Sequence, residues 1–319
     1  MATAEQIKSL VKAHVERNDE KFKTIALQIA AHEAKMGHSK IARDLKLLID
    51  KPIPLHPNVV KINNLSPMLE LKMQLHKLSE LIVSDDIHDK IRRILVEYEN
   101  RNKLNAYGLV NRRNILIVGA PGTGKTLTAS VIATELSLPF YTVQMDKIVT
   151  KYMGETSVKL RQIFENIESN PGVYLFDEFD AIGIDRNYDN EVGEMRRILN
   201  SFLQFLEQGS PNSIIVAATN NPQVLDSALF RRFDDVLQYD LPTSQEIKRL
   251  FIKKLVPYDR DFVVDEKIIL ASEKLSHAEI SRICEDAIKN SILTDVPINH
   301  HHLLNLVEER HHVYSKREV

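Results

Sequence analysis

A glycine-rich run follows the apolar segment 115–118. Three of the ten glycines in the chain lie in the run GAPGTGKT, which matches the pattern G-x-x-x-x-G-K-[ST]. Glycines at these positions allow backbone N–H groups to face phosphate oxygens. Lys125 is expected to reach the β- and γ-phosphates of a nucleotide, and Thr126 is expected to ligate Mg²⁺. The alternative is a simple turn between a strand and a helix. The residues expected to contact the nucleotide here are Gly119, Ala120, Pro121, Gly122, Thr123, Gly124, Lys125, Thr126 and Leu127.

Two adjacent carboxylates end a second apolar segment, 173–176. Parallel strands present their carboxyl ends to the ligand, so Asp177 and Glu178 are expected beside the phosphates. Asp177 suits Mg²⁺, which prefers hard oxygen ligands, and Glu178 is then free to polarise an attacking water. The alternative is a pair of solvated acids. The spacing after the glycine-rich run favours the catalytic interpretation.

Further polar residues follow a third apolar segment, 214–218. Asn220 could bond the attacking water or the γ-phosphate. Arg231 and Arg232 stand together in a predicted surface turn. An arginine supplied by a neighbouring molecule is a known means of neutralising charge on a transferring phosphoryl group.

Length and composition set limits on the class of protein. A chain of 319 residues with 43% hydrophobic content predicts about two domains with real cores. The net charge of -2 disfavours a dedicated nucleic-acid binder. Cys284 is the single cysteine, and no apolar stretch follows Met1, so a cytoplasmic location is expected. No run approaches the roughly 18 apolar residues of a membrane span, so any membrane role would go through a partner.

The first part of the chain has helical periodicity. Residues 1–50 predict a bundle of three helices, with caps at Asn18 and Ser39 and a stop at Gly37. The bundle could dock a substrate or partner, or it could only pad the main domain. Three prolines within six residues, Pro52, Pro54 and Pro57, predict an extended linker or docking strap over residues 51–67.

The rest of the chain divides into two predicted parts. Residues 68–242 alternate helices with apolar strands, which predicts an α/β nucleotide-binding domain with a parallel sheet. The strands are expected at 115–118, 140–143, 173–176, 214–218 and 236–239. Residues 243–319 predict a helical lid domain. Its helices are expected at 245–255, 266–275, 278–293 and 300–309.

The histidines at 300–302 and 311–312 invite a metal interpretation. Adjacent histidines such as His301 and His302 cannot share a helical face, and no cysteine or dense acidic cluster completes a tetrahedral set. A surface helix that opens after Asn299 is the favoured interpretation.

These motifs together resemble the AAA family of ATPases, in the branch that remodels or unfolds proteins, and in particular short bacterial members with one ATPase module. The similarity covers residues 81–290. Besides GAPGTGKT, its motifs are KYMGETS from Lys151, FDEFDAIG from Phe176, AATNNP from Ala217, LDSALFRRFD from Leu225 and LSHAEI from Leu275. The resemblance implies an α/β P-loop NTPase fold, with ATP and Mg²⁺ as cofactors. It also implies a homo-hexameric ring that acts on a protein substrate.

The resemblance assigns a role to each motif. It places Lys125 and Thr126 in Walker A, Asp177 and Glu178 in Walker B, and Asn220 at sensor 1. Arg231 and Arg232 become intersubunit fingers. Tyr152, Met153 and Gly154 resemble the pore loop that grips an extended polypeptide, although Tyr152 and Met153 could instead pack under the following helix. In the lid, His277 and Ala278 stand where Gly-Ala is common beside the nucleotide.

The arginine motif departs from the family pattern, and the adenine-binding residues are less clear from the sequence. The family often has R-P-G-R-F-D, whereas Arg231 and Arg232 are adjacent, so the sequence leaves open which one reaches the neighbour. The base pocket is expected at 82–83 and 107–109 from position alone. Alternative functions are a switch or loader on nucleic-acid machinery and a phosphotransferase with a small acceptor. An adaptor bound by residues 1–50 and a separate protease are further expected partners.

Overall fold

A computed structural model of the protein forms two units, residues 1–60 and residues 61–319. No helix among the residues that it describes combines the length and apolar character of a bilayer span. The described residues are 8–9, 19–38, 40, 43, 66–73, 76–148, 153–180, 189–209, 212–225, 227–260 and 262–315.

The described part of the first unit is essentially one helix, α2, Asp19–Lys35. Its buried apolar side chains are Ile25, Ala26, Ile29 and Ala30. Gly37 ends the helix with a left-handed backbone at φ 86°, and the N–H groups of Gly37 and His38 donate to carbonyls in the last turn. The helix therefore stops where the sequence predicts, by a Schellman-type motif. The predicted cap at Asn18 and the helices on either side fall almost wholly outside the described residues.

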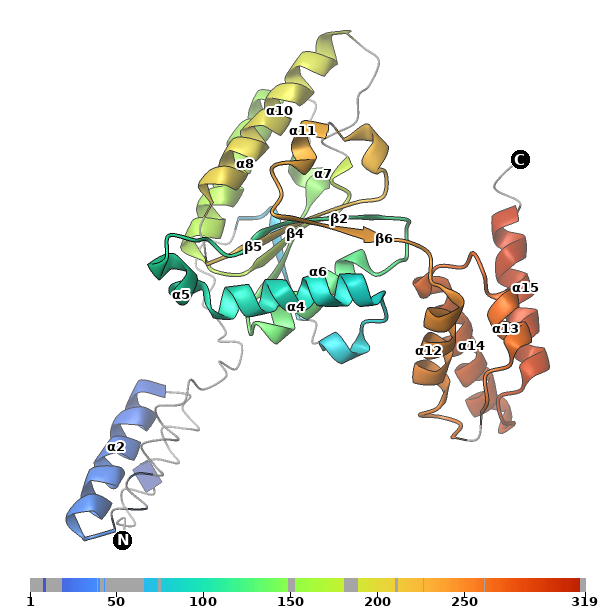
Figure 1. Ribbon diagram of the computed structural model, residues 1–319, viewed down its shortest axis with the longest axis horizontal. Helices are drawn as coiled ribbons and strands as arrows, with labels where there is room; N and C mark the ends of the chain where they lie inside the picture. Colours follow the sequence, from blue (N-terminus) through green and yellow to red (C-terminus); the bar gives the residue numbers. More distant parts are fainter. Residues whose placement is uncertain are drawn as a thin grey trace. The chain divides into compact units, whose positions relative to one another are not determined.

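A six-stranded sheet forms the centre of the second unit, with strand order β1-β3-β4-β5-β2-β6 (Figure 1). The five strands from β2 to β6 run parallel and lie within one residue of the predicted segments. The strands are β1 Leu69–Lys72, β2 Asn114–Gly119, β3 Phe140–Val143, β4 Val173–Phe176, β5 Ile214–Thr219 and β6 Asp235–Tyr239.

The strand β1 adds an antiparallel edge to the predicted parallel sheet. It pairs with β3, with Leu69 opposite Val143. Its sequence LELK alternates leucines with charged residues, and only Leu69 is buried. Four residues with one buried side chain are too short a signal to separate from a loop, so this strand could not be predicted from the sequence.

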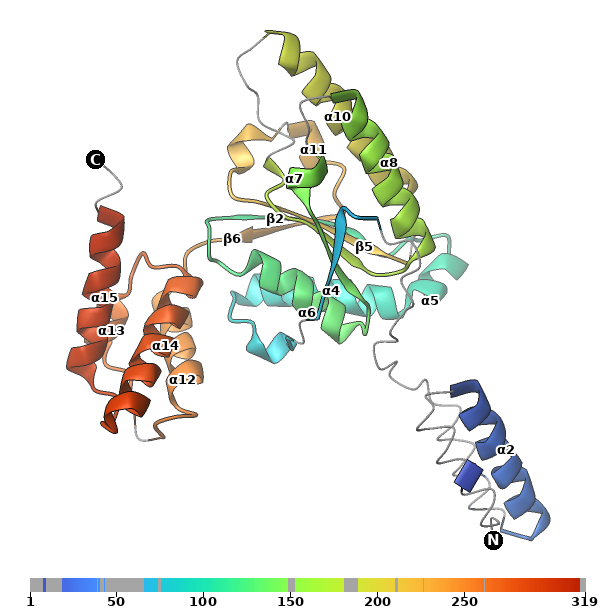
Figure 2. The ribbon, with the colours of Figure 1, turned by 180° about the vertical axis from the view of Figure 1, so that it is seen from behind.

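Helices cover both faces of the sheet (Figures 1 and 2). Side chains alternate along β2, so that Ile115 and Ile117 face α4 and α6, whereas Leu116 and Val118 face α8 and α10. Burial on both faces explains why these strands read as continuous apolar runs. The helices of this part are η1 Leu78–Glu80, α4 Asp85–Glu99, α5 Arg101–Ala106, α6 Lys125–Glu135, α7 Met145–Ile148, α8 Met153–Ser169, α10 Asp189–Gln208, η2 Pro222–Val224 and α11 Ser227–Phe230.

Four helices follow the sheet, as the sequence predicts. They are α12 Ser244–Leu255, α13 Glu266–Ala271, α14 His277–Thr294 and α15 His300–Ser315. Their apolar faces share a core of their own, with α14 packed against α12 and α15. Asn299 caps α15, because its side-chain oxygen accepts the N–H of His302 at 2.8 Å. The helix α13 ends at Ala271, four residues before the predicted end at residue 275. Within the part predicted as helix, Lys274 has a positive φ of 69°.

Candidate active site

The glycine-rich run forms the turn between β2 and α6. Gly124 precedes the helix with a left-handed backbone, and Lys125 is its first residue. Two other glycines stand where no side chain fits. A Cβ on Gly119 would lie 2.3 Å from the carbonyl oxygen of Tyr239, and one on Gly122 would lie 2.6 Å from Oγ of Ser276. The backbone thus stays close to its neighbours and leaves its N–H groups and the helix N-terminus available to an anion.

Lys125 is almost fully buried inside this turn. Its Nζ donates hydrogen bonds of 2.8 Å to the carbonyl oxygens of Gly119 and Ala120. Burial lowers the pKa of the Lys125 ammonium, and the carboxylates of Asp177 and Asp180 partly oppose that shift. A cation held by two neutral carbonyls is suited to exchange one of them for a phosphate oxygen.

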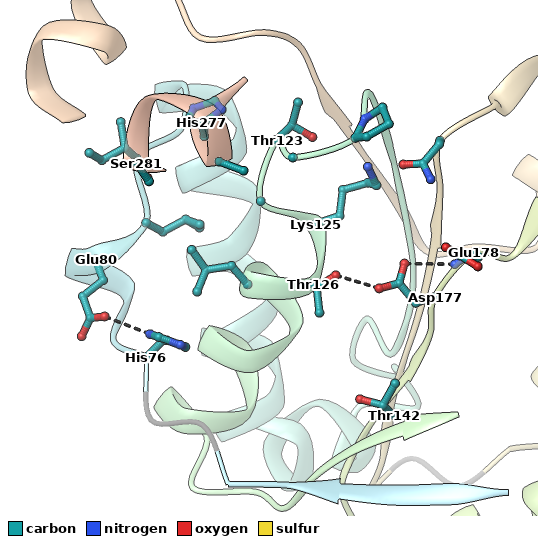
Figure 3. Close-up of a pocket in the computed structure, with 18 of the residues that line it drawn as sticks. His76, Glu80, Thr123, Lys125, Thr126, Thr142, Asp177, Glu178, His277 and Ser281 are labelled. Carbon is teal, nitrogen blue, oxygen red and sulfur yellow. Dashed lines mark hydrogen bonds and ion pairs between the residues drawn. The ribbon is translucent and has the colours of Figure 1, made fainter. Parts of the chain in front are cut away.

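Thr126 and Asp177 meet although they come from different elements. Oγ1 of Thr126 donates a hydrogen bond of 2.7 Å to Oδ2 of Asp177 (Figure 3). The other carboxylate oxygen, Oδ1, accepts the backbone N–H of Glu178 at 3.0 Å. A hydroxyl and a carboxylate within reach of one another form the hard oxygen set that Mg²⁺ prefers. These two residues therefore fit the predicted metal, and Thr126, whose proton goes to Asp177, would offer its lone pairs to the ion.

Glu178 and Asn220 line the same cavity of about 950 Å³ as Lys125, Thr126 and Asp177. Glu178 has a left-handed backbone at φ 52° and an exposed side chain. Asn220 follows β5 directly. Because β5 lies between β4 and β2, the residues after these three strands emerge at one edge of the sheet. The order of the strands brings together the two acids, the asparagine and the loop.

The lid contributes His277 and Ala278 to the cavity. The N–H of Ala278 donates to the carbonyl of Gly122 at 2.9 Å, which ties α14 to the glycine-rich turn. Both ring nitrogens of His277 are buried, and neither makes a hydrogen bond of normal geometry. Burial lowers the pKa of His277, while the carboxylate of Glu246 and the nearby backbone of Ile82 oppose that shift.

The residues expected around the base divide into three groups. Ile82 lines the cavity, whereas Val83 is buried in the core beneath α6. Tyr107 and Leu109 are 77% and 58% exposed and do not line the cavity. The positional expectation at 107–109 was therefore wrong for this structure, because the turn after α5 points its side chains to solvent.

Arg231 and Arg232 lie in the turn after α11, and both are exposed. Neither lines the cavity that holds Lys125 and Glu178. Arg232 forms an ion pair with Glu207 near the end of α10. Among the interactions of the described residues, Arg231 has no such carboxylate partner. The structure thus shows different ion pairing for Arg231 and Arg232, which the sequence alone could not distinguish.

The predicted pore loop is only partly described. Tyr152 lies outside the described residues, and Met153 and Gly154 are the first two residues of α8. The hydroxyl of Thr156, one turn further along, donates to the carbonyl of Ile148 at 3.2 Å and is fully buried. The start of α8 is in this way fastened to the end of α7.

Several residues of the cavity were not predicted from the sequence. Those on β3 follow directly from the topology, because the carboxyl end of β3 reaches the same edge as β2 and β4. The lid lysines have no comparable local signal. Lys253 donates to the carbonyl of Ser79, so its position depends on how the lid meets η1. The additional polar residues that line the cavity are His76, Glu80, Thr142, Gln144, Asp146, Lys253, Lys254 and Ser281.

Comparison with known proteins gives a consistent result. Residues 115–241 match the model of the "ATPase family associated with various cellular activities (AAA)". The chain is similar to the "Uncharacterized AAA family ATPase y4kL" of Sinorhizobium fredii, with 34% identity over 304 residues, or 92% of this chain and 90% of that protein. It is also similar to the "Putative 26S proteasome regulatory subunit homolog" of Methanothermobacter thermautotrophicus. That identity is 30% over 270 residues, or 79% of this chain and 72% of the relative.

A solved structure supports the same fold. The crystal structure of the FIGL-1 AAA domain superposes with a TM-score of 0.61, covering 76% of this chain and 86% of that chain. At 21% sequence identity this likeness concerns the fold alone.

Proposed function

The chain belongs to the AAA family of ATPases, and from this premise we propose that it uses ATP hydrolysis to remodel, unfold or translocate protein substrates as a ring oligomer, a homo-hexamer. One observation carries the proposal of a ring. Arg231 and Arg232 are exposed and lie outside the cavity that gathers Lys125 and Glu178. A single chain therefore offers no arginine to the transferring phosphoryl group from this pair, and a neighbouring copy could supply one.

The residues of the cavity suit this reaction. The turn and Lys125 would hold the ATP phosphates, and Thr126 and Asp177 would hold Mg²⁺, which neutralises charge on the phosphates when it is bound. Glu178 would orient and polarise the attacking water. Asn220 would hold that water or the γ-phosphate from the adjacent strand.

The ion pair with Glu207 supports different roles for the two arginines. We infer that Arg231 is the finger that reaches the neighbour, because its guanidinium is exposed and is not paired with a carboxylate of the described chain. Arg232 is held by Glu207, so it would fix the turn at the interface. This assignment gives each arginine a different expected loss on substitution.

A protein substrate is supported by the relatives and by one motif. A relative that the chain covers over 72% of its length is named as a homolog of a proteasome regulatory subunit. The motif consists of an aromatic residue, a thioether and a glycine, at Tyr152, Met153 and Gly154. Such a motif can grip many kinds of side chain without requiring a particular substrate sequence. We propose that residues 1–50 bind the substrate or an adaptor. If degradation follows, a separate chain would supply the protease.

We propose that the protein makes no direct contact with nucleic acid or membrane and that it is located in the cytoplasm. The net charge of -2 lacks the electrostatic footprint of a nucleic-acid binder. Cys284 is buried and free, and burial raises the pKa of its thiol to about 12, so this cysteine is suited to a core position and not to a disulfide.

The decisive experiment measures threading. Tyr152→Ala should keep basal ATP hydrolysis within a few-fold and abolish the unfolding of a tagged model protein, because the role proposed for Tyr152 is to grip the substrate and not to act in the nucleotide chemistry. Tyr152→Phe is the matched control and should retain unfolding, since it keeps the aromatic ring. Unimpaired unfolding by Tyr152→Ala, or stimulation of the wild-type ATPase by DNA and not by protein, would contradict the proposal.

A further inference from the structure

We propose that Thr219 is a positioning residue for ATP hydrolysis, which holds Glu178 and Asn220 in a fixed relation through one buried hydroxyl. The inference rests on the roles proposed above for Glu178 and Asn220, and it does not depend on the protein substrate. Thr219 does not line the cavity. Its effect would pass entirely through the segments that it joins.

The hydroxyl of Thr219 makes two hydrogen bonds, one to each segment. Oγ1 donates to Oδ1 of Asp180 at 3.1 Å and accepts the backbone N–H of Asn221 at 3.0 Å. Asp180 lies two residues after Glu178, and Asn221 lies next to Asn220. A hydroxyl has one proton to donate, and here that proton goes to a carboxylate. The two segments that carry the catalytic candidates Glu178 and Asn220 are therefore joined by a chain of two hydrogen bonds.

The backbone places Thr219 at the junction of three strands. It is the last residue of β5 and pairs with Val118, the residue before the glycine-rich turn. One residue earlier, the carbonyl of Ala218 accepts the N–H of Phe179 at 2.9 Å. Phe179 is fully buried, and its ring centroid lies 4.8 Å from that of Phe202. The turn after β4 is thus fastened to β5 by a backbone bond and by the Thr219 hydroxyl.

These bonds matter because Glu178 itself is weakly held. Its side chain is exposed, its backbone is left-handed at φ 52°, and its N–H donates to the neighbouring Asp177. A non-glycine residue keeps such a backbone only when its surroundings impose it. Thr219 is fully buried, so water cannot replace its hydroxyl without opening the core. Loss of the hydroxyl would leave the backbone folded and let Glu178 and Asn220 move independently.

The hydroxyl could instead serve stability alone, as many buried hydroxyls do. The two interpretations differ in what they predict for kinetics. A positioning role acts on the arrangement of water and γ-phosphate, so it lowers kcat and leaves nucleotide affinity nearly unchanged. A purely structural role lowers the melting temperature and reduces activity only through the fraction of protein that is folded.

The test is Thr219→Val in the full-length protein, which keeps the shape of the side chain and removes both bonds. The kcat for ATP should fall about ten- to a hundredfold, while the Kd of a fluorescent ADP analogue changes less than about threefold. Thr219→Ser restores the hydroxyl and should recover most of the kcat. Ser213→Ala is the matched control, because Ser213 is buried beside the opposite end of β5 and donates to the carbonyl of Ile167.

Substitutions of Asp180 test the same hydrogen bond at its acceptor. Asp180→Ala removes the acceptor and should lower kcat as Thr219→Val does, whereas Asp180→Asn keeps an oxygen acceptor and should lower it less. The double variant should be no slower than the slower single variant, since the Thr219–Asp180 bond that Asp180→Ala removes is already absent in Thr219→Val. Asp180 is only half-buried, so Asp180→Ala decides the question if Thr219→Val does not fold.

Glu178→Gln and Asn220→Ala are measured in the same assays to distinguish the catalytic roles of Glu178 and Asn220 from the positioning role of Thr219. If they keep full kcat, the roles on which the inference rests are wrong. If they lose kcat while Thr219→Val keeps it, only the positioning role is overturned. A loss by Ser213→Ala equal to that of Thr219→Val, or no recovery with Thr219→Ser, also overturns it.

Discussion

The hydroxyl of Thr126 and the carboxylate of Asp177 are joined by a hydrogen bond of 2.7 Å across 51 positions of sequence. Thr126 is held by the first turn of α6, and Asp177 follows β4. The bond places two oxygen groups that are predicted to ligate Mg²⁺ side by side at the edge of the sheet that carries the glycine-rich turn. It connects the residues predicted for Mg²⁺ with those predicted for the phosphates.

The first prediction concerns the metal. Thr126→Val and Asp177→Asn should each raise the Mg²⁺ concentration for half-maximal ATP hydrolysis by at least about tenfold, because each weakens the oxygen set for the ion. Thr126→Ser keeps the hydroxyl and should behave like the wild type. The ATPase rate is measured as a function of the free Mg²⁺ concentration, and a chelator provides the sample without free Mg²⁺. A wild-type Mg²⁺ dependence in Thr126→Val would remove this residue from the metal site.

The second prediction separates binding from chemistry. Lys125→Ala should lose ATP binding, because a cation buried in the turn is replaced by a methyl group. Glu178→Gln should bind ATP and hydrolyse it very slowly, because only the water-activating carboxylate is lost. Nucleotide titrations and single-turnover rates distinguish the two. Glu165→Gln on the exposed face of α8 is the control. Equal losses of affinity in both variants would contradict the assigned roles.

The third prediction concerns the arginines and assembly. Arg231→Ala should reduce turnover by about 10³–10⁵-fold, as expected for an arginine finger. Arg232→Ala should reduce it less. Glu207→Gln breaks only an exposed ion pair and should stay within about fivefold of the wild type. Rates are measured at a protein concentration that saturates assembly. The opposite order, with Arg232→Ala the slower variant, would exchange the two roles.

If a neighbouring subunit supplies the arginine, activity should depend on protein concentration. ATPase activity per subunit should rise with protein concentration and level off as rings form, because ATP that bridges an interface stabilises it. In mixtures, Arg231→Ala/Arg232→Ala subunits with intact Lys125 should regain activity when a Lys125→Ala partner donates its arginines. Constant activity per subunit from nanomolar to micromolar protein, with no rescue on mixing, would exclude the intersubunit site.

The last prediction concerns residues 1–50. The chain divides into units at 1–60 and 61–319, and α2 has a buried apolar face of its own. Deleting residues 1–50 should therefore leave a folded ATPase with the melting temperature of the sheet domain nearly unchanged. Recruitment of the protein substrate should be lost. A truncated protein that is insoluble or cannot hydrolyse ATP would show that residues 1–50 are part of the ATPase domain and that the predicted domain boundary is wrong.

Much of the site could be predicted from the sequence because its signals are local. The spacing of glycines, Lys125 and Thr126 is set by one turn of backbone, and the apolar runs before Asp177 and Asn220 mark buried parallel strands. The stop at Gly37 and the cap at Asn299 depend on one or two residues each. In each case the residues that determine the feature are adjacent in the chain, so the pattern is complete in one dimension.

Only the tertiary structure decided which distant residues meet. Thr219 reads as one more polar residue at the end of an apolar run, and its bond to Asp180 exists because β5 lies beside β4 in a particular register. Arg231 and Arg232 are equivalent in sequence until Glu207 pairs with one of them. Such contacts depend on strand order, register and helix packing, which arise from the burial of the whole core and leave no periodic trace in any single segment.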